Sequence, residues 1–204
     1  MKYQHIVFDL DGTLLDTEYG VLHSFQDTLL EVTGRRNPLN ELTFCLGITG
    51  EDALVQLNIE NVPSVLALWI EKLNTYENTV CPFPEIPELI SSLASKGYQF
   101  GIVTSKTRNE FEKQIRNYEF HKYLSTTVCA EDTDEHKPTA APLLKYMELT
   151  GCSKDELLYV GDSRYDSECA RNAGADFALA TWGTHSPELP AEYYPKSPLE
   201  LLSL

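Results

Sequence analysis

The sequence predicts an α/β protein in which a parallel sheet forms the core and one inserted segment is entirely helical. Short apolar runs alternate with amphipathic stretches along most of the chain, a pattern typical of parallel strands joined by helical crossovers. The alternation stops once, between about Asp16 and Cys81, where several helix-like stretches occur without a strand-like run. With 204 residues and 42% hydrophobic content, the chain can bury one substantial core and a small second subdomain.

The elements of the core follow one another in a regular order. Five apolar runs are predicted to be strands: His5–Phe8, Gln99–Thr104, Thr126–Ala130, Leu157–Val160 and Asp176–Ala180. Apolar residues at helical spacing predict four helices between them: Ile86–Lys96, Arg108–Tyr118, Ala140–Leu149 and Tyr165–Ala173. Gly97 and Gly174 follow two of these helices, at positions where a helix often ends in a residue with positive φ.

The inserted segment carries its own helix signals. Thr49 precedes Glu51 and Asp52, which gives one helix an N-cap and a favourably charged first turn. A second helix is indicated by apolar residues at helical spacing: Val65, Leu66, Trp69, Ile70 and Leu73. We interpret this stripe as the segment's own core. Since the proline-rich stretch Cys81–Pro87 would lead back to the sheet, we expect a core of residues 1–15 and 83–204 and a helical segment of residues 16–82.

Composition limits the partners and the compartment. A net charge of −15 argues against nucleic acid and anionic membrane surfaces, whose phosphates are bound by Lys and Arg. No apolar stretch approaches the ~20 residues needed to cross a bilayer, and the N-terminal apolar run is too short for a signal peptide. The five cysteines include no Cys-x-x-Cys pair, which suits reduced thiols and a cytoplasmic location. The sequence does not predict an oligomeric state.

Polar side chains follow four of the predicted strands. The carboxyl ends of parallel strands meet at one edge of a sheet, so we expect these side chains to form one site. The groups are Asp9-Leu10-Asp11-Gly12-Thr13 after the first strand, Thr104-Ser105-Lys106 after the second, His136-Lys137 beyond the third and Asp162 to Asp166 after the fourth.

The residue types at this edge indicate phosphoryl chemistry. Four carboxylates, from Asp9, Asp11, Asp162 and Asp166, would repel one another unless a cation lay among them, and oxygen ligands without His or Cys favour Mg²⁺. The positive charge of Lys137 and the hydroxyl group of Thr104 suit phosphoryl oxygens. A carboxylate can attack phosphorus, which predicts Asp9 as nucleophile, and a second carboxylate can transfer protons, which predicts Asp11 as general acid and base.

The quoted stretches together resemble a known family. DLDGTLLDTE, TSK, HKP and GDSRYD are similar, in order and spacing, to the four motifs of the haloacid dehalogenase superfamily. The resemblance implies a Rossmann-like core, a helical cap inserted after the first motif and an obligatory Mg²⁺. By motif position it assigns the metal to Asp9, the backbone carbonyl of Asp11 and Asp162, with Asp166 in support. It assigns the substrate phosphate to Thr104, Ser105 and Lys137.

The stretch Ala173–Gly183 also resembles members of the phosphoglycolate phosphatase type. Two positions depart from the usual pattern: Glu85, where such relatives often carry Gly, and Ser105, where many carry Asn. The first lies at the connection to the inserted segment, and the second lies next to the predicted phosphate site.

The resulting prediction is a Mg²⁺-dependent phosphatase that hydrolyses a small phosphorylated metabolite through an aspartyl-phosphate. A sugar phosphomutase is the nearest alternative, because it shares the aspartyl-phosphate step; GDSRYD resembles the phosphatases more than the motif of the mutases. Asp11 argues against a dehalogenase, because it supplies the acid and base that phosphoryl transfer needs. A receiver-type signalling module would use similar residues, but it lacks a helical insert. We expect substrate choice to depend on the stretch Leu46–Asp52.

Overall fold

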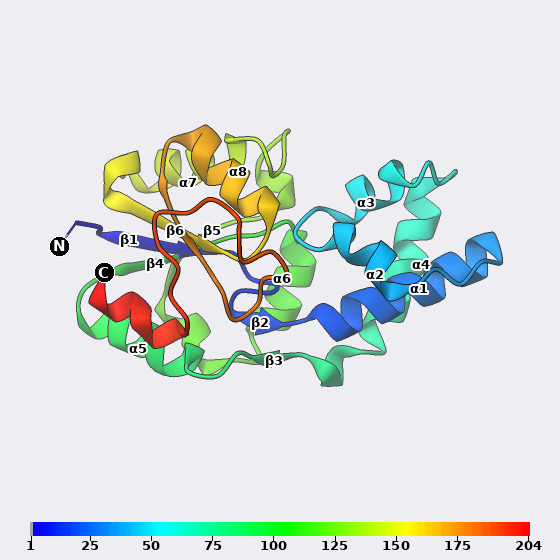
Figure 1. The fold of residues 1–204 in the computed structure, drawn as a ribbon, viewed down its shortest axis with the longest axis horizontal. Helices are drawn as coiled ribbons and strands as arrows, with labels where there is room; N and C mark the ends of the chain where they lie inside the picture. The colour runs from blue at the N-terminus through cyan, green and yellow to red at the C-terminus, as the bar shows by residue number, and fades with distance from the viewer. Residues whose placement is uncertain (1) are drawn as a thin grey trace.

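The computed structural model describes residues 2–204, and a five-stranded parallel sheet lies at its centre (Figure 1). The strand order is β5-β4-β1-β6-β7, so β1 lies in the middle, paired on one side with β4 and on the other with β6. The strands are β1 (His5–Phe8), β4 (Gln99–Val103), β5 (Leu124–Val128), β6 (Leu157–Gly161) and β7 (Asp176–Leu179). This architecture is the predicted α/β arrangement.

Helices cover both faces of the sheet. The side chains of β1 alternate between two apolar clusters, since Ile6 and Phe8 belong to one and Val7 to the other. Figure 1 shows α5 below the sheet and α7 and α8 above it. The helices are α5 (Ile86–Ser95) and α6 (Arg108–Ile115), which contribute to the first cluster, and α7 (Ala141–Thr150) and α8 (Arg164–Ala173), which contribute to the second.

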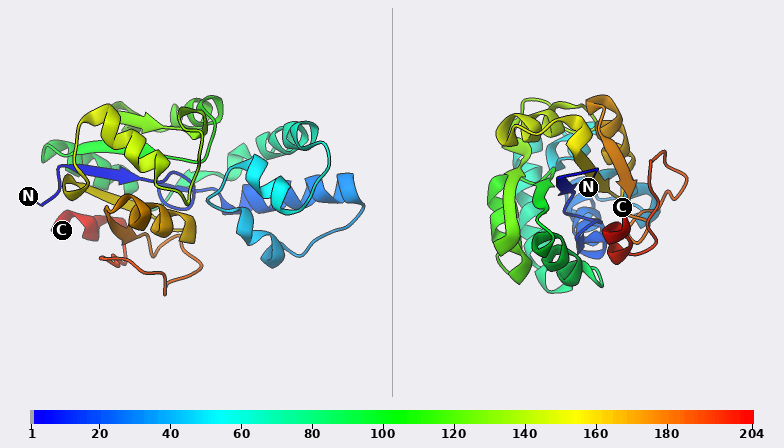
Figure 2. Two further views of the ribbon diagram at one scale, coloured as in Figure 1. Left: turned by 90° about the horizontal axis from the view of Figure 1, so that it is seen from above. Right: turned by 90° about the vertical axis from the view of Figure 1, so that its left-hand side faces the viewer.

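A separate group of helices lies beyond the carboxyl ends of the strands (Figures 1 and 2). Its apolar cluster shares no residue with the two clusters of the sheet. In this cluster the ring of Phe25 stacks on Trp69 with 4.2 Å between centroids, and Trp69 Nε1 donates to Ser24 Oγ at 3.0 Å. The tryptophan is therefore a core residue, as the sequence indicated. The helices are α1 (Glu18–Thr33), α2 (Leu39–Leu42), α3 (Gly50–Gln56) and α4 (Val62–Asn74).

Two short strands join this helical segment to the sheet. β2 (Leu15–Asp16) and β3 (Cys81–Pro82) pair antiparallel, and Phe83 N donates to the carbonyl of Leu14 at 3.0 Å. The sequence did not predict this ribbon, because two residues are too few to produce an alternating pattern. The segment then enters α5 through Glu85, whose φ of +69° lies in the left-handed region that favours glycine.

Two predicted elements differ from the observed ones by more than a residue. β5 lies two residues earlier than the predicted Thr126–Ala130, because Ala130 already starts a 3-10 turn whose Asp132 carboxylate accepts from Cys129 N at 2.7 Å. α6 stops at Ile115, three residues before the predicted end. The chain there tightens into i→i+3 bonds, from Asn117 N and Tyr118 N, before the next turn begins.

The remaining elements agree with the prediction at their ends to within one residue. Thr49 caps α3 as expected, since its side chain accepts from Asp52 N at 3.1 Å. None of the helices between residues 2 and 204 has both the length and the apolar character to cross a bilayer. Over the same residues the five cysteines are all free thiols.

Candidate active site

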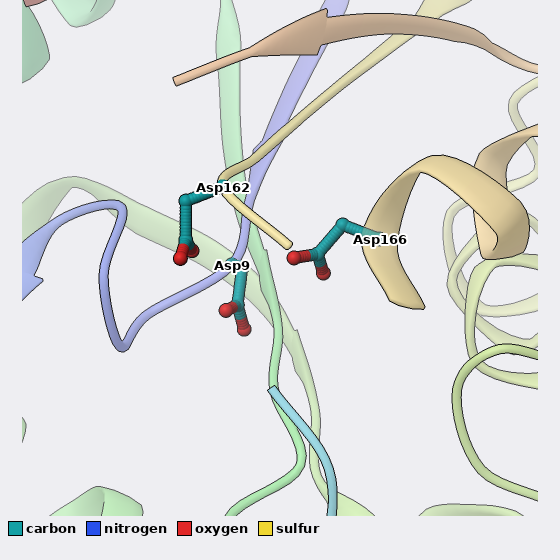
Figure 3. A group of neighbouring side chains, drawn as sticks. All are labelled: Asp9, Asp162 and Asp166. Carbon is teal, nitrogen blue, oxygen red and sulfur yellow. The ribbon is translucent and has the colours of Figure 1, made fainter. Parts of the chain in front are cut away.

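Three carboxylates converge at the carboxyl edge of the sheet (Figure 3). Asp9 directly follows β1, Asp162 follows β6, and Asp166 lies in the first turn of α8. Each offers an oxygen atom that lies within 4.8 Å of the other two. Asp9 and Asp166 are buried, with 2% and 0% of their surface exposed. The structure thus brings together three of the four carboxylates that the sequence placed at this edge.

The turn after Asp9 fits closely around Asp162. Gly12 has a φ of +78°, and a Cβ atom added to it would lie 2.4 Å from Asp162 Oδ2, so both backbone conformation and space require glycine. Thr13 Oγ1 donates to Asp162 Oδ1 at 2.9 Å. The indole of Trp182 donates to the carbonyl of Thr13 at 2.8 Å. These contacts fix the position of the turn relative to β6.

Lys137 supplies the positive charge within the cluster. Its Nζ donates to Asp9 Oδ1 and to Asp166 Oδ1, each at 2.8 Å. All three side chains are almost fully buried, with 1%, 3% and 0% exposed for the lysine and the two carboxylates. Because the two carboxylates together outweigh the burial of the ammonium group, the pKa of Lys137 lies above its usual value and the side chain is charged.

Asp166 has no lone pair directed freely at a ligand. Its Oδ1 also accepts from Tyr159 OH at 2.8 Å, and its Oδ2 accepts from Ser163 N at 3.1 Å and from Ser163 Oγ. The same serine caps α8, so the helix start and the carboxylate position each other. Asp166 therefore orients Lys137.

Asp9 and Asp162 fit a divalent cation. Within residues 2–204 no hydrogen bond engages Asp9 Oδ2 or Asp162 Oδ2. Burial, with added repulsion from Asp166 and Asp11, raises the pKa of Asp9 to about 7 although Lys137 opposes the shift. Burial and the neighbouring carboxylates raise the pKa of Asp162 well above its usual value. The two buried carboxylates therefore lack sufficient counter-charge. Both offer only oxygen atoms as ligands, and Mg²⁺ prefers oxygen ligands.

Asp11 points toward a second lysine. Its Oδ1 lies 3.2 Å from Lys106 Nζ, and the carboxylate retains 21% exposure. Burial disfavours the charge of Lys106, but Asp11 and Glu110 outweigh it and raise the pKa of this lysine above its usual value. Lys106 is part of the TSK stretch, but the sequence alone predicted no role for it. Its position directly after Ser105, at the carboxyl end of a predicted strand, was the feature that could have indicated a place in the site.

Thr104 and Ser105 differ in their surroundings. Thr104 is buried, its backbone N–H continues the sheet ladder to Val128 O at 3.0 Å, and its Oγ1 accepts from Lys106 N at 3.2 Å. Ser105 Oγ donates to the carbonyl of Gly47 at 3.0 Å, in the loop that precedes α3. The serine hydroxyl thus links the end of β4 to the helical segment. Contact between Ser105 and a substrate phosphate stays a prediction.

A family model described as haloacid dehalogenase-like hydrolase matches residues 6–180, which include every residue of this site. The chain belongs to this hydrolase family. The predicted family and the predicted fold class are confirmed.

Several relatives of this hydrolase carry names of phosphatases. A protein of Clostridium perfringens, provisionally named pyrophosphatase PpaX, is 31% identical over 208 residues, which cover 98% of this chain and 95% of that one. A phosphoglycolate phosphatase of Aquifex aeolicus is 30% identical and covers 87% of this chain and 84% of that one. A crystal structure from Lactobacillus plantarum, provisionally named phosphoglycolate phosphatase, superposes with a TM-score of 0.91 at 28% identity, over 100% of this chain and 99% of that one. These matches support the predicted enzyme class, a phosphatase.

A cavity of about 340 Å³ in this hydrolase opens in front of the carboxylates. Asp9, Asp11 and Asp162 line one end of it, and side chains of the helical segment line the other. The volume is within the range of small-molecule sites. A ligand in it would contact both the sheet domain and the helical segment.

Proposed function

We propose that this hydrolase is a Mg²⁺-dependent phosphatase that hydrolyses a small phosphomonoester through an aspartyl-phosphate on Asp9. The observation that carries the proposal is that Lys137 donates to Asp9 and Asp166 at 2.8 Å each, directly behind Asp9 and Asp162, which line the end of the cavity. A buried lysine between carboxylates gives the site a fixed positive charge for phosphoryl oxygens. The names of the relatives from Clostridium perfringens and Aquifex aeolicus agree with this chemistry.

The reaction has two steps on this chain's residues. In the first, the carboxylate of Asp9 attacks phosphorus, the bond between phosphorus and the ester oxygen breaks, and Asp11 gives its proton to the departing oxygen. In the second, Asp11 takes a proton from water, which attacks the aspartyl-phosphate and releases inorganic phosphate with Asp9 restored. Thr104 and Lys137 would bind the phosphoryl oxygens during both steps, and Ser105 is proposed at the edge of that site.

Asp9, the backbone carbonyl of Asp11 and Asp162 would hold Mg²⁺, with Asp166 in support through Lys137. When bound, the metal offsets the charge of the two carboxylates and of the phosphoryl group, so that Asp9 is ionised at neutral pH. We further propose the division into a sheet domain of residues 1–15 and 83–204 and a helical cap of residues 16–82. The separate apolar cluster of the helical segment supports this division.

The test is release of inorganic phosphate from a panel of phosphomonoesters with Mg²⁺ and with excess chelator. We expect release with Mg²⁺ alone, and mass spectrometry of acid-quenched protein should find a phosphoryl group on the peptide that contains Asp9. Asp9→Asn is the matched variant, since it keeps the shape of the side chain. Full activity in chelator, or a labelled peptide that lacks Asp9, would contradict the proposal. Phosphoryl transfer within a sugar phosphate without net release would indicate the phosphomutase alternative.

A further inference from the structure

The far end of the cavity is lined by apolar side chains of α4. Leu66, Ile70 and Leu73 are spaced four and three residues apart, so they lie on one face of the helix, and all three line the cavity. Each is half-buried in the structure. Val21 of α1 extends the same wall. When the phosphorus atom lies at Asp9, a leaving group that points away from the sheet therefore contacts these apolar side chains.

This wall has no positive charge. The inserted segment of residues 16–82 contains three basic residues against ten acidic ones: Arg35, Arg36 and Lys72. None of the three lines the cavity. Two of them are paired elsewhere, Lys72 with Glu31 at 2.7 Å and Arg35 with Glu41 at 3.8 Å.

On the sheet side, the basic groups that line the cavity within residues 2–204 are Lys106 and His136. Lys106 already forms an ion pair with Asp11, and His136 Nδ1 lies 3.7 Å from a carboxylate oxygen of Asp52. An anionic leaving group would thus lose its water without gaining a free cation, and this is costly for any charge.

Beyond the aspartates of the site, four glutamates line the cavity: Glu51 is exposed to solvent, where its charge is well hydrated, and the other three are engaged with groups of the chain. Both oxygens of Glu131 accept from Arg108 N, Glu110 closes the N-cap of α6 by accepting from Thr107 N at 2.9 Å, and Glu18 accepts from His185 at 2.8 Å. These contacts hold the carboxylates for local structure. They do not favour a cationic leaving group over a neutral one.

We infer that the leaving group of the substrate is uncharged and largely apolar, such as an aryl or alkyl alcohol, rather than a second phosphate, a carboxylate-bearing alcohol or an amino alcohol. The inference rests on the proposed function, because it concerns the group bonded to the transferred phosphoryl. It extends that function by assigning substrate recognition to the apolar face of α4. The transferred phosphoryl is recognised at the sheet end of the cavity, so only the far end separates these classes.

Binding of phosphonates, which cannot be hydrolysed, tests the inference independently of turnover. Calorimetry with the full chain in excess Mg²⁺ would compare benzylphosphonate with phosphonoacetate, methylenediphosphonate and 2-aminoethylphosphonate. We expect benzylphosphonate to bind at least ~10-fold more tightly than each of the other three, because burial of one aromatic group is worth at least that factor. Equal or tighter binding of any of the other three would overturn the inference.

A charge placed on the wall should change the ranking. Ile70→Lys puts a cation on the lining face of α4, and we expect it to lower the preference for benzylphosphonate over phosphonoacetate by ~10-fold or more. Ala67→Lys is the matched control, since it adds the same charge to an exposed position of the same helix outside the cavity lining. An unchanged preference in Ile70→Lys, or an equal change in Ala67→Lys, would contradict the inference.

The two proposals fail in distinguishable ways. If benzylphosphonate binds best but no ester of the panel releases phosphate, the proposed reaction is wrong and the assignment of the apolar subsite stands. If phosphate is released fastest from pyrophosphate or phosphoglycolate, the reaction stands and the inference is wrong. Circular dichroism of both lysine variants checks that α4 is intact. If the variants do not fold, the order in which the unsubstituted protein binds the four phosphonates still decides whether the leaving group is apolar.

Discussion

Lys137→Met removes the one charge that two buried carboxylates share and keeps most of the side-chain volume. Asp9 and Asp166 then face each other without the ammonium group, which lies 2.8 Å from both in the structure. Loss of one partner from a buried ion pair costs about 3–5 kcal/mol. For a chain of this length that cost corresponds to a fall in Tm of roughly 6–20 °C.

The assay is urea unfolding in excess chelator at pH 8 and at pH 5, followed by circular dichroism. At pH 8 the variant must either bury the two charges without a counter-ion or draw a proton from a solution that supplies few, so the cost is large. At pH 5 Asp9 takes up a proton readily, because removal of Lys137 raises the pKa of this carboxyl further, and the difference from the unsubstituted protein should shrink. Lys145→Met is the control, since Lys145 is partly exposed and pairs with Glu148 at 2.9 Å; we expect a change below about 1 kcal/mol. A difference under about 1 kcal/mol at pH 8 for Lys137→Met, or the same difference at both pH values, would refute the argument.

Three further outcomes follow from the same site. Asp9→Asn should lower kcat by more than ~10³-fold while far-UV circular dichroism stays unchanged; activity within tenfold of the original would exclude Asp9 as nucleophile. Asp11→Asn should bind Mg²⁺ in a calorimetric titration with little loss of affinity yet lose turnover, whereas loss of metal binding with retained turnover would reverse the two assignments. In chelator, the melting temperature should fall as pH rises from about 4 to about 7, because burial raises the pKa of Asp9 from 3.8 to about 7, so the folded state holds the proton that the unfolded state releases. Saturating Mg²⁺ should flatten this slope, and a slope of opposite sign would show that the buried carboxylates are compensated without metal.

The gathering of Asp9, Lys137 and Asp162 was predictable because it depends on topology. Once the apolar runs are read as parallel strands, their carboxyl ends must meet, and the polar residues after them must lie together. The motif order added roles to these positions. Neither argument needs knowledge of side-chain conformations.

Other features depend on contacts that a linear pattern does not contain. Tyr159 lies within the apolar run Leu157–Val160 and is indistinguishable there from a core residue, yet its hydroxyl binds Asp166 at 2.8 Å. The pairing of Lys106 with Asp11 requires two loops to approach from different strands. The apolar stripe of α4 was interpreted as core alone. In the structure Val65 and Trp69 are buried in the core, but Trp69 also lines the cavity together with Leu66, Ile70 and Leu73.

The separation of the apolar clusters bears on how the chain opens and closes locally. The cluster under α1, α3 and α4 has few members compared with the cluster on one face of the sheet, and the covalent path between them is the narrow ribbon of β2 and β3. Backbone amides of α1 and α4 should therefore exchange with deuterium through an opening of lower free energy than those of β1 and β6. Since Asp9 and Asp162 follow the slowly exchanging strands, the reacting groups would stay in place while the helices fluctuate above them.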